Sequence, residues 1–340
     1  MSAAAPLLVG INGFGSIGRR FFRQAEARPE LRVVAVNDIG DLPTLAHLLH
    51  YDSSYGPFAA EVRLQDGALV VGGRQVRVWS EPEPGAVPWR EAGVEVVLEA
   101  TGLWTDRRAA LHITAGGARR VVVSAPSSEE DVTLIMGVNE QEYDPARHHV
   151  ISAASCTTQC LAVTCQALAD AFGLRRALAS TLHAYTNDQR LLDLPHRDLR
   201  RARGAALNII PVPSGAARAV EKAMPQLRGR LGASSFRVPT AAVSVIDLVA
   251  ELQRPAGVAQ INAAFEAAAE SPALRGRLGV SHEPLVSQDF RGDPRSAVVD
   301  LPLTQVVDGT LCEVVAWYDN EWGYSARLVD LLIHLAARGR

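Results

Sequence analysis

The stretch LLVGINGFGSIGR, residues 7–19, decides the fold of the first half of the chain. An apolar run is followed by Gly13, Gly15 and Gly18 in the spacing G-x-G-x-x-G, and then by a segment with helical spacing. Asp38 lies twenty residues beyond Gly18, where the next apolar run ends. Glycines in such a turn let the backbone approach a pyrophosphate, and the acidic side chain accepts from ribose hydroxyls. The pattern predicts a dinucleotide-binding strand–turn–helix; the alternative is an ordinary strand–turn–helix with Asp38 as a cap.

Further apolar runs follow this stretch. They lie at 32–37, 95–100, 120–125 and 149–154, with helical spacing at 19–27 and 42–49 between them. Continuous apolar runs are typical of a parallel sheet covered on both faces. The segment 68–79, centred on Gly72-Gly73, predicts an inserted β-hairpin. We therefore expect a doubly wound first domain.

The second half has a different pattern. A helix is expected at 157–172, and long alternating strands at 177–185, 234–252, 296–302 and 312–319. Such strands favour an antiparallel sheet with helices on one face. The segment 186–213 is too long for an ordinary connection, which indicates a functional loop.

Together these patterns predict two domains. The first is an α/β Rossmann-type dinucleotide-binding domain over 1–155, completed by a C-terminal amphipathic helix within 321–340. The second is an α+β catalytic domain over 156–320 with a mixed or antiparallel sheet.

Composition excludes several classes of protein. The 340 residues are 48% hydrophobic and carry a formal net charge of −3. Near-balanced charge gives no electrostatic reason to expect nucleic acid or a membrane surface as a partner. No apolar stretch approaches a membrane span, and the first residues lack the charged region of a signal peptide. Four cysteines do not make a disulfide framework, so we expect a cytoplasmic protein.

Cys156 and His183 are the candidate reactive pair. Cys156 lies where a strand gives way to a helix, and a helix N-terminus is expected to lower a thiol pKa. Cys160 and Cys165 fall in the helix body, and their spacing matches no zinc pattern, so no metal is expected. His183 ends the strand 177–183 and is a candidate base; the alternative is a structural histidine.

These motifs resemble one family, the phosphorylating glyceraldehyde-3-phosphate dehydrogenases. The stretches that carry the resemblance are INGFGSIGR, SAASCTTQCLA, HAYTNDQRLLDLPHRDLRRAR, NIIPVPSGAA, FRVPTAAVSVIDL and WYDNEWGYSARL. They occur in the family's order and spacing, from residue 8 to about residue 335.

The resemblance implies a reaction. Cys156 would attack the aldehyde carbon of glyceraldehyde 3-phosphate, and His183 would take the proton and stabilise the oxyanion. Hydride would pass to NAD, and inorganic phosphate would cleave the thioester to 1,3-bisphosphoglycerate. The residues implied at the cofactor are Gly13, Phe14, Gly15, Ser16, Ile17, Gly18, Asp38, Ser124, Asn320 and Tyr324.

The resemblance also implies two anion pockets. The pocket for the substrate's phosphate would be formed by Thr186, Asp188 and Arg237. The pocket for the attacking phosphate would be formed by Ser155, Thr157, Ser214, Gly215 and Arg201, the arginine chosen by position over Arg200 and Arg203. Hydroxyls and guanidinium groups donate to phosphate oxygens. The alternative for the arginine cluster is a solvated basic loop.

Cofactor choice and assembly follow from two further features. The Asp38 carboxylate would repel the 2′-phosphate of NADP, which favours NAD. Leu194-Pro195 resembles the NAD-selective members, in which this loop reaches a neighbouring subunit's cofactor. The resemblance and the long polar loop predict a homotetramer.

The chain departs from the family's pattern in the glycine loop, around the nucleophile and in the phosphate loop. Ser16, Ala153, Gln159, Val163 and Ser214 replace the family's usual Arg, Asn, Asn, Pro and Thr. None of these changes removes a catalytic group. One hypothesis is that Ala153 and Gln159 make the chain an isoenzyme tolerant of electrophiles that alkylate Cys156; the alternative is drift.

Two other functions compete with this interpretation. An erythrose-4-phosphate dehydrogenase would oxidise a longer aldose phosphate without needing to form an acyl phosphate. A non-catalytic regulatory paralogue would bind ligands without turnover. The residues Thr186 and Arg237 favour the triose enzyme, and intact Cys156 and His183 argue against lost catalysis.

Overall fold

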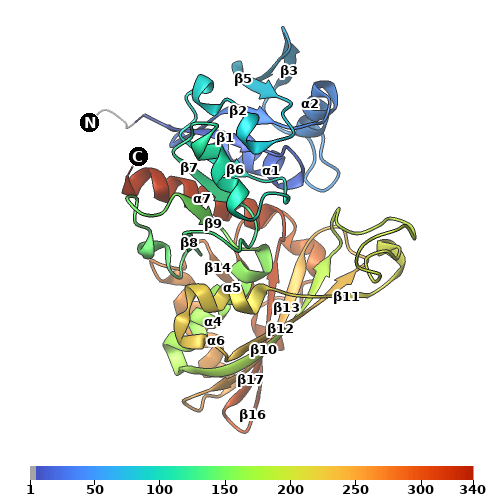
Figure 1. The fold of residues 1–340 in the computed structure, drawn as a ribbon. Helices are drawn as coiled ribbons and strands as arrows, with labels where there is room; N and C mark the ends of the chain where they lie inside the picture. The colour runs from blue at the N-terminus through green and yellow to red at the C-terminus, as the bar shows by residue number, and fades with distance from the viewer. Residues whose placement is uncertain (1–4, 340) are drawn as a thin grey trace. The chain divides into compact units, whose positions relative to one another are not determined.

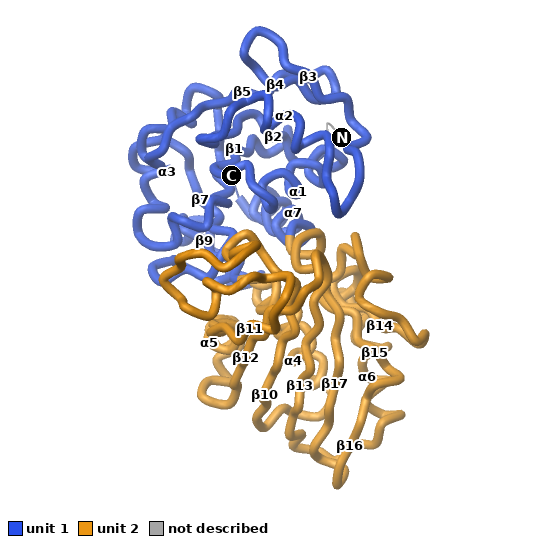
Figure 2. The backbone as a smooth tube through the Cα atoms, turned by 90° about the vertical axis from the view of Figure 1, so that its right-hand side faces the viewer, with its two compact units in different colours: residues 1–134, 140–154, 325–340 blue, residues 135–139, 155–324 orange. Residues whose placement is uncertain are grey.

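The computed structural model describes residues 5–339, which form two compact units (Figure 2). Unit 1 contains the residues up to Leu134, Glu140–Ala154, and the residues from Ser325 onward. Unit 2 contains Ile135–Asn139 and Ser155–Tyr324.

Unit 1 is built around a largely parallel sheet, as its continuous apolar runs predict (Figure 1). The central strand β1 (Leu7–Asn12) pairs in parallel with β2 (Leu31–Asn37) and β6 (Val96–Glu99). The strand order is β3-β4-β5-β2-β1-β6-β7-β9-β8. The remaining strands are β3 (Val62–Gln65), β4 (Ala68–Val71), β5 (Arg74–Trp79), β7 (Arg120–Val123), β8 (Val132–Thr133) and β9 (Val150–Ser152). The predicted hairpin is confirmed, because β4 and β5 pair antiparallel across the two glycines.

Four helices accompany this sheet in the described part of the chain: α1 (Ser16–Ala25), α2 (Leu42–His50), α3 (Leu111–Thr114) and the part of α7 (Trp322–Arg338) from Ser325 on. The helix expected at 19–27 begins earlier, directly after Gly15, so its N-terminus lies at the glycine turn. Asp41 caps α2 by accepting from the backbone N–H of Thr44 at 2.9 Å.

Unit 2 contains a mixed sheet, which confirms the expected α+β class. Its strand order is β11-β12-β10-β13-β17-β15-β14, with β16 paired to β17. The pairs β10–β12 and β14–β15 are parallel and the others are antiparallel, so the sheet is not purely antiparallel. The strands are β10 (Leu174–Ala184), β11 (Ile210–Val212), β12 (Leu231–Val238), β13 (Ser244–Leu252), β14 (Leu278–Ser281), β15 (Ala297–Asp300), β16 (Gln305–Val307) and β17 (Leu311–Tyr318).

Helices cover one face of this sheet. They are α4 (Cys156–Phe172), α5 (Ala216–Ala223) and α6 (Val258–Glu270), and their buried side chains share one core with alternate residues of β10, β13 and β17. The other face carries exposed leucines and valines. This division follows the period of two along each strand.

One predicted element is wrong in its extent. The segment 234–252 was expected to be one strand, but it divides into β12 and β13. Between them Val243 adopts φ +67°, which is unfavourable for a β-branched residue. This turn brings Ser244 to the start of β13.

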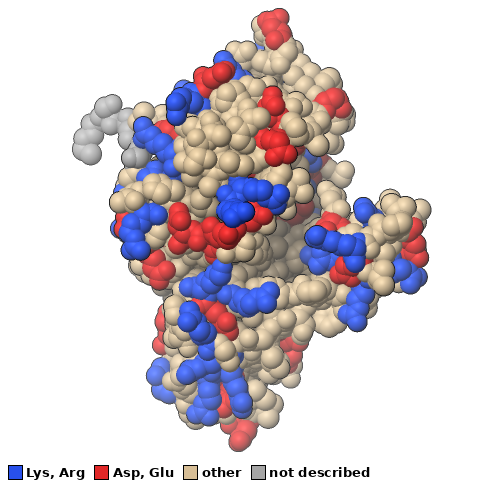
Figure 3. All heavy atoms as spheres, in the orientation of Figure 1, with Lys and Arg blue, Asp and Glu red and all other residues tan. Residues whose placement is uncertain are grey.

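Two further features are the distribution of surface charge and the character of the helices. On the face drawn in Figure 3, basic and acidic side chains are interspersed over both units. Within residues 5–339, none of the helices has the length and apolar character needed to cross a bilayer.

Candidate functional site

The structure brings Cys156 and His183 together. Cys156 is the first residue of the 17-residue helix α4, and His183 lies near the end of β10. The Cys156 Sγ atom is 3.3 Å from His183 Nε2. Ser155 caps the helix, because its Oγ accepts from the backbone N–H of Thr158 at 3.2 Å. A nucleophile is thus placed beside a base at a helix N-terminus.

The neighbours of His183 Nδ1 are one acceptor, the Ala184 carbonyl, and one donor, the Arg237 guanidinium. Nδ1 lies 2.6 Å from the carbonyl oxygen of Ala184, which can only accept. With the proton on Nδ1, the ring donates to this carbonyl and the Nε2 lone pair faces the thiol; with the proton on Nε2, Nδ1 accepts from Arg237. Burial and the guanidinium of Arg237 lower the pKa of His183 to about 3, so the ring is neutral. Arg237 contacts the ring at Nδ1 and donates to the same Ala184 carbonyl at 3.1 Å.

The expected lowering of the Cys156 pKa is wrong for this structure. Burial raises the pKa of Cys156, and this effect outweighs the lowering by Arg237 and by the hydroxyl and backbone N–H of Thr157. The helix N-terminus alone does not compensate for the loss of hydration. The thiol is thus protonated at rest, so formation of the nucleophile needs a proton acceptor, and His183 Nε2 is the acceptor within reach.

Tyr318 and Thr181 lie beside this pair and are functional candidates that sequence reasoning missed. The Tyr318 hydroxyl lies 2.9 Å from the hydroxyl of Thr157 and 2.9 Å from that of Thr181. Its ring meets the His183 ring edge to face, with centroids 6.1 Å apart. Strand alternation marks Tyr318 and Thr181 only as core positions, and their meeting depends on the strand order β10-β13-β17.

Asn320 is tied to the end of β10 through Ser244, a third residue that sequence reasoning missed. The Ser244 hydroxyl donates to Asn320 Oδ1 at 3.0 Å and accepts from the Ala184 backbone N–H at 3.1 Å. All three atoms lie in buried residues. The strained turn at Val243 therefore fixes a hydrogen bond that holds Asn320 near the residue following His183.

The residues expected in two anion pockets are partly rearranged. Asp188 pairs with Arg201, although the resemblance assigns them to different pockets. His196 lies 3.6 Å from the same carboxylate, because the loop folds back between positions 188 and 201. Burial lowers the pKa of Arg237. Arg201 and Asp188 act on that pKa in opposite directions, so all three charges lie in one neighbourhood.

The other expected anion-binding residues lie at helix starts or in the loop. Ser214 precedes α5, where its Oγ accepts from the backbone N–H of Ala216 at 3.3 Å, and Gly215 is the residue before that helix. Helices α4 and α5 pack against each other. The backbone N–H of Thr186 donates to Gln189 Oε1 at 3.2 Å. Serine and glycine at helix starts are suited to binding an anion.

The glycine turn of unit 1 fits a dinucleotide. Gly13 has φ +90°, and a Cβ there would lie 2.6 Å from the Thr101 nitrogen. A Cβ on Gly18 would lie 2.2 Å from the Gly13 carbonyl oxygen, so these two glycines allow the turn and the helix to pack. A Cβ on Gly15 would meet nothing within 4 Å, and this residue is exposed. The open position is the approach for a pyrophosphate to the N-terminus of α1.

Asp38 and a buried network support that turn. Asp38 accepts from the backbone N–H groups of Phe14 at 2.6 Å and Gly40 at 2.8 Å. Beneath the turn, the Asn12 side chain donates to Glu99 at 2.6 Å, and Glu99 is 2.9 Å from His112 Nε2. Composition and spacing gave no sign of this network, because its members come from separate strands and a helix.

The remaining cofactor candidates either form hydrogen bonds within unit 1 or are wholly or partly buried. The Ser16 hydroxyl accepts from Arg20, which also pairs with Asp52 at 3.1 Å. The Ser124 backbone N–H donates to the Glu99 carbonyl at 2.9 Å, at the end of β7. Phe14 is buried, and Ile17 is half-buried in the first turn of α1. Burial raises the pKa of Tyr324.

Three departures from the family's pattern are buried, and one of them, Val163, lies in the core of unit 2. Ala153 is 1% exposed and Gln159 is 2% exposed. Gln159 lines a small internal space together with Cys156, Tyr318 and Tyr324. The hypothesis that Ala153 and Gln159 confer tolerance of alkylating electrophiles stays a prediction.

Among residues 5–339, histidine, cysteine and acidic side chains do not gather in groups of three or more that could hold a metal ion.

Comparisons with known proteins cover nearly the whole chain. Residues 7–107 match the model of the glyceraldehyde 3-phosphate dehydrogenase NAD binding domain, and residues 155–320 match that of its C-terminal domain. The chain is 53% identical over 332 residues to glyceraldehyde-3-phosphate dehydrogenase of Geobacillus stearothermophilus, covering 97% of this chain and 98% of the relative. It is 52% identical to glyceraldehyde-3-phosphate dehydrogenase 1 of Bacillus subtilis over 332 residues, covering 97% and 98%. It is also 52% identical to glyceraldehyde-3-phosphate dehydrogenase 2 of Streptomyces arenae over 324 residues, covering 95% and 96%. The chain therefore belongs to the glyceraldehyde-3-phosphate dehydrogenase family.

Proposed function

We propose that this chain catalyses the reversible, NAD-dependent phosphorylating oxidation of glyceraldehyde 3-phosphate to 1,3-bisphosphoglycerate, a glycolytic reaction. The observation that carries the proposal is the contact between Cys156 Sγ and His183 Nε2 at the start of α4. Family membership and the two matched domains give the reaction class.

In the proposed mechanism, His183 Nε2 removes the thiol proton as Cys156 attacks the aldehyde carbon. This step requires the resting ring to carry its proton on Nδ1, where it donates to the Ala184 carbonyl and holds the ring in place. The protonated ring then faces the developing oxyanion and stabilises it. Bound at the glycine turn and by Asn320, NAD would supply the hydride acceptor. Cys156 holds the acyl group as a thioester until phosphate attacks it.

Two anion-binding regions would position the phosphate groups. Arg237, with Thr186 and Asp188, is proposed to bind the phosphate of the substrate. Ser155, Thr157, Ser214 and Gly215, at the starts of α4 and α5, are proposed to bind the attacking phosphate, with Arg201 from the loop. Arg201 pairs with Asp188 through Nη1, and its other N–H groups are the ones that would donate to the anion.

NAD is the cofactor of this family's N-terminal domain, and the turn at Gly15 has room for its pyrophosphate. Asp38 is proposed to bind the adenosine ribose and to disfavour the 2′-phosphate of NADP by like-charge repulsion. Asn320, oriented by Ser244, is proposed to hold the nicotinamide carboxamide.

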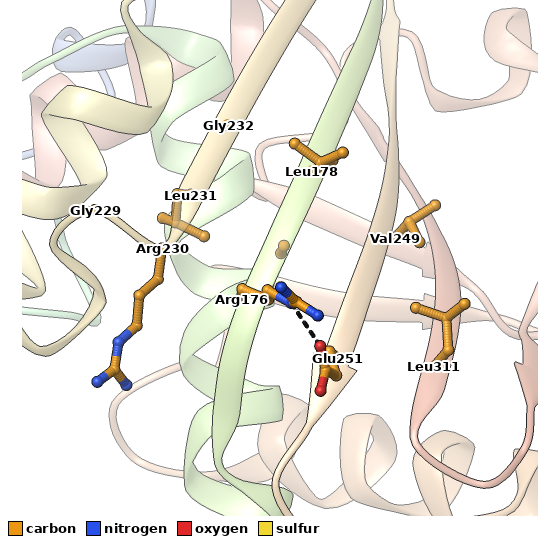
Figure 4. A pocket seen from close by; sticks show the side chains of 10 residues that line it. Arg176, Leu178, Gly229, Arg230, Leu231, Gly232, Val249, Glu251 and Leu311 are labelled. Atoms are coloured by element: carbon orange, nitrogen blue, oxygen red, sulfur yellow. Dashed lines mark hydrogen bonds and ion pairs between the residues drawn. The ribbon is translucent and has the colours of Figure 1, made fainter.

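Self-association into a homotetramer, in the cytoplasm, is part of the proposal. The uncovered face of the unit 2 sheet presents Leu178, Val249 and Leu311 side by side on β10, β13 and β17 (Figure 4). They line a shallow hollow of about 520 Å³, beside the paired charges Arg176 and Glu251. A face that carries apolar side chains and both signs of charge is suited to an isologous contact with a second copy.

The test is the phosphate dependence of NAD reduction by the purified protein. With glyceraldehyde 3-phosphate, turnover should require inorganic phosphate, and NADP should be a poorer substrate than NAD. Cys156→Ser should lower kcat by about 10³-fold or more, because the hydroxyl is a far weaker nucleophile.

Two outcomes would contradict the proposal. Faster turnover of erythrose 4-phosphate, without a phosphate requirement, would assign the chain to the related aldose-phosphate activity. A folded wild-type protein that binds NAD but reduces none would indicate a regulatory paralogue.

A further inference from the structure

Three hydroxyl groups next to the nucleophile form one hydrogen-bonded chain. Thr157, the residue after Cys156, lies 2.9 Å from the Tyr318 hydroxyl, which lies 2.9 Å from that of Thr181. The chain ends where the Thr181 hydroxyl donates to the Val245 carbonyl at 3.2 Å. Tyr318 and Thr181 are both 2% exposed, so water does not substitute for these partners.

The direction of the hydrogen bonds among these three hydroxyl groups follows from counting their protons. Each hydroxyl has one proton, and the Val245 carbonyl can only accept. Because Thr181 gives its proton to Val245, it accepts from Tyr318, and Tyr318 in turn accepts from Thr157. The Thr157 proton therefore points to Tyr318, away from the sulfur of Cys156.

Negative charge at the reaction site requires the opposite direction. A thiolate or a phosphate oxygen accepts hydrogen bonds, so Thr157 must turn its proton toward that charge. Its oxygen then accepts from Tyr318, and Tyr318 accepts from Thr181, which releases the Val245 carbonyl. Reversing the direction of these hydrogen bonds turns the Thr157 proton away from Tyr318, so that Thr157 becomes a hydrogen-bond donor at the reaction site.

We propose that Tyr318 and Thr181 are positioning residues whose hydroxyl chain reverses to make Thr157 a donor to the Cys156 thiolate and to the attacking phosphate. The phosphate part rests on the proposed function. A purely structural role, in which Tyr318 ties α4 to the sheet, is the competing explanation.

Thr181→Val separates these explanations. Valine has nearly the shape of threonine but neither accepts nor donates, so the Tyr318 proton has Thr157 as its remaining acceptor in the chain. This variant holds Thr157 in the donating orientation. Inorganic phosphate should bind about threefold more tightly, and the alkylation of Cys156 by iodoacetamide should reach half its maximal rate at lower pH. Loss of a structural contact predicts weaker binding instead.

The measurements use the full-length protein with NAD bound. Calorimetric titration with inorganic phosphate reports binding without turnover, and the pH profile of alkylation reports the Cys156 thiol without phosphate. Thr181→Ser keeps the hydroxyl and should restore the wild-type values. Ser180→Ala removes a hydroxyl from the next position of β10, on the other face of the sheet, and should change neither measurement.

The dependence on Tyr318 completes the test. In a Tyr318→Phe background, Thr181→Val should have no further effect on either measurement, because the intermediate hydroxyl is missing. The proposal is overturned if Thr181→Val leaves both measurements unchanged, weakens phosphate binding, or acts equally with and without Tyr318. If Tyr318→Phe does not fold, the contrast between Thr181→Val and Thr181→Ser decides. Failure of the wild type to bind phosphate would count against the proposed function. The pH profile of alkylation would still test whether the hydroxyl chain reverses.

Discussion

Arg237 acts on the charge of both reacting residues, next to the larger effect of burial. It lowers the pKa of both Cys156 and His183 by its positive charge, and it donates to the carbonyl that His183 also contacts. One guanidinium therefore favours the thiolate and at the same time keeps the histidine neutral. The same group is proposed to bind the substrate's phosphate, so substrate binding and nucleophile chemistry depend on one side chain.

Replacing Arg237 tests that dual dependence. In Arg237→Leu, loss of the positive charge should raise the pKa of Cys156, so the alkylation profile by iodoacetamide moves to higher pH. The KM for glyceraldehyde 3-phosphate should rise at least about tenfold, because a buried charged contact is lost. Arg237→Lys keeps the positive charge, so the pH profile of alkylation should stay close to that of the wild type. The KM should still rise, because lysine lacks the paired donors of a guanidinium. A profile in Arg237→Leu that is unchanged, or that moves to lower pH, would contradict this account.

At the scale of elements, the glycine turn shows how one strand–turn–helix uses glycines for two purposes. Gly18 allows the helix to pack on the turn, since a Cβ would lie 2.2 Å from a backbone oxygen. Gly15 has open space around its Cβ position and lies at the N-cap of α1. Gly18 is therefore needed for folding, and Gly15 for ligand binding.

The matched pair Gly15→Ala and Gly18→Ala tests this division. Gly18→Ala should destabilise the protein by about 2–3 kcal/mol, because backbone must move to admit the methyl group. Gly15→Ala should cost less than about 1 kcal/mol but raise the Kd for NAD about tenfold, because its methyl group occupies the approach of the pyrophosphate. Urea unfolding and NAD titration of both variants separate the effects. Equal stability losses in the two variants would refute the division.

The elements also show what sequence can predict. Periodicity predicts β1, β2, β6 and the hairpin of β4 and β5, because burial on one or both faces determines the local spacing of apolar residues. It misses the break between β12 and β13, although Pro239 directly after β12 is a local signal for the end of a strand, whereas the positive φ at Val243 has none. The same limit applies to the site. Cys156 and His183 are marked by their own motifs, whereas Tyr318, Thr181 and Ser244 become neighbours only through strand order and register.

The pKa of Cys156 illustrates a second limit. A helix N-terminus is visible in the sequence, but the hydration lost by the folded thiol is not. The sign of the shift depends on both, so the local argument gave the wrong direction. Burial is a property of the packed chain.

At the scale of the whole molecule, the exposed apolar groups are the surfaces through which we propose that copies of the chain associate. Leu178 is 70% exposed on the uncovered sheet face, beside Val249 and Leu311. The loop at 186–209 adds several leucines that are more than half exposed: Leu191, Leu192, Leu194, Leu199 and Leu207. Two separate apolar surfaces on one chain are what a tetramer with two kinds of two-fold contact requires.

The final prediction concerns that assembly. Leu178→Asp places a charge among apolar side chains of the sheet face, so sedimentation should show a smaller species than the wild-type tetramer. Leu64→Asp is the matched control, because this leucine is 42% exposed on β3 of unit 1, whereas both apolar surfaces belong to unit 2. The control should sediment as the wild type does. Because Leu178 lies outside the proposed catalytic residues, any loss of activity in Leu178→Asp should follow the loss of assembly and reverse as protein concentration rises. A wild-type protein that sediments as a fully active monomer would show that the exposed leucines have another partner or none.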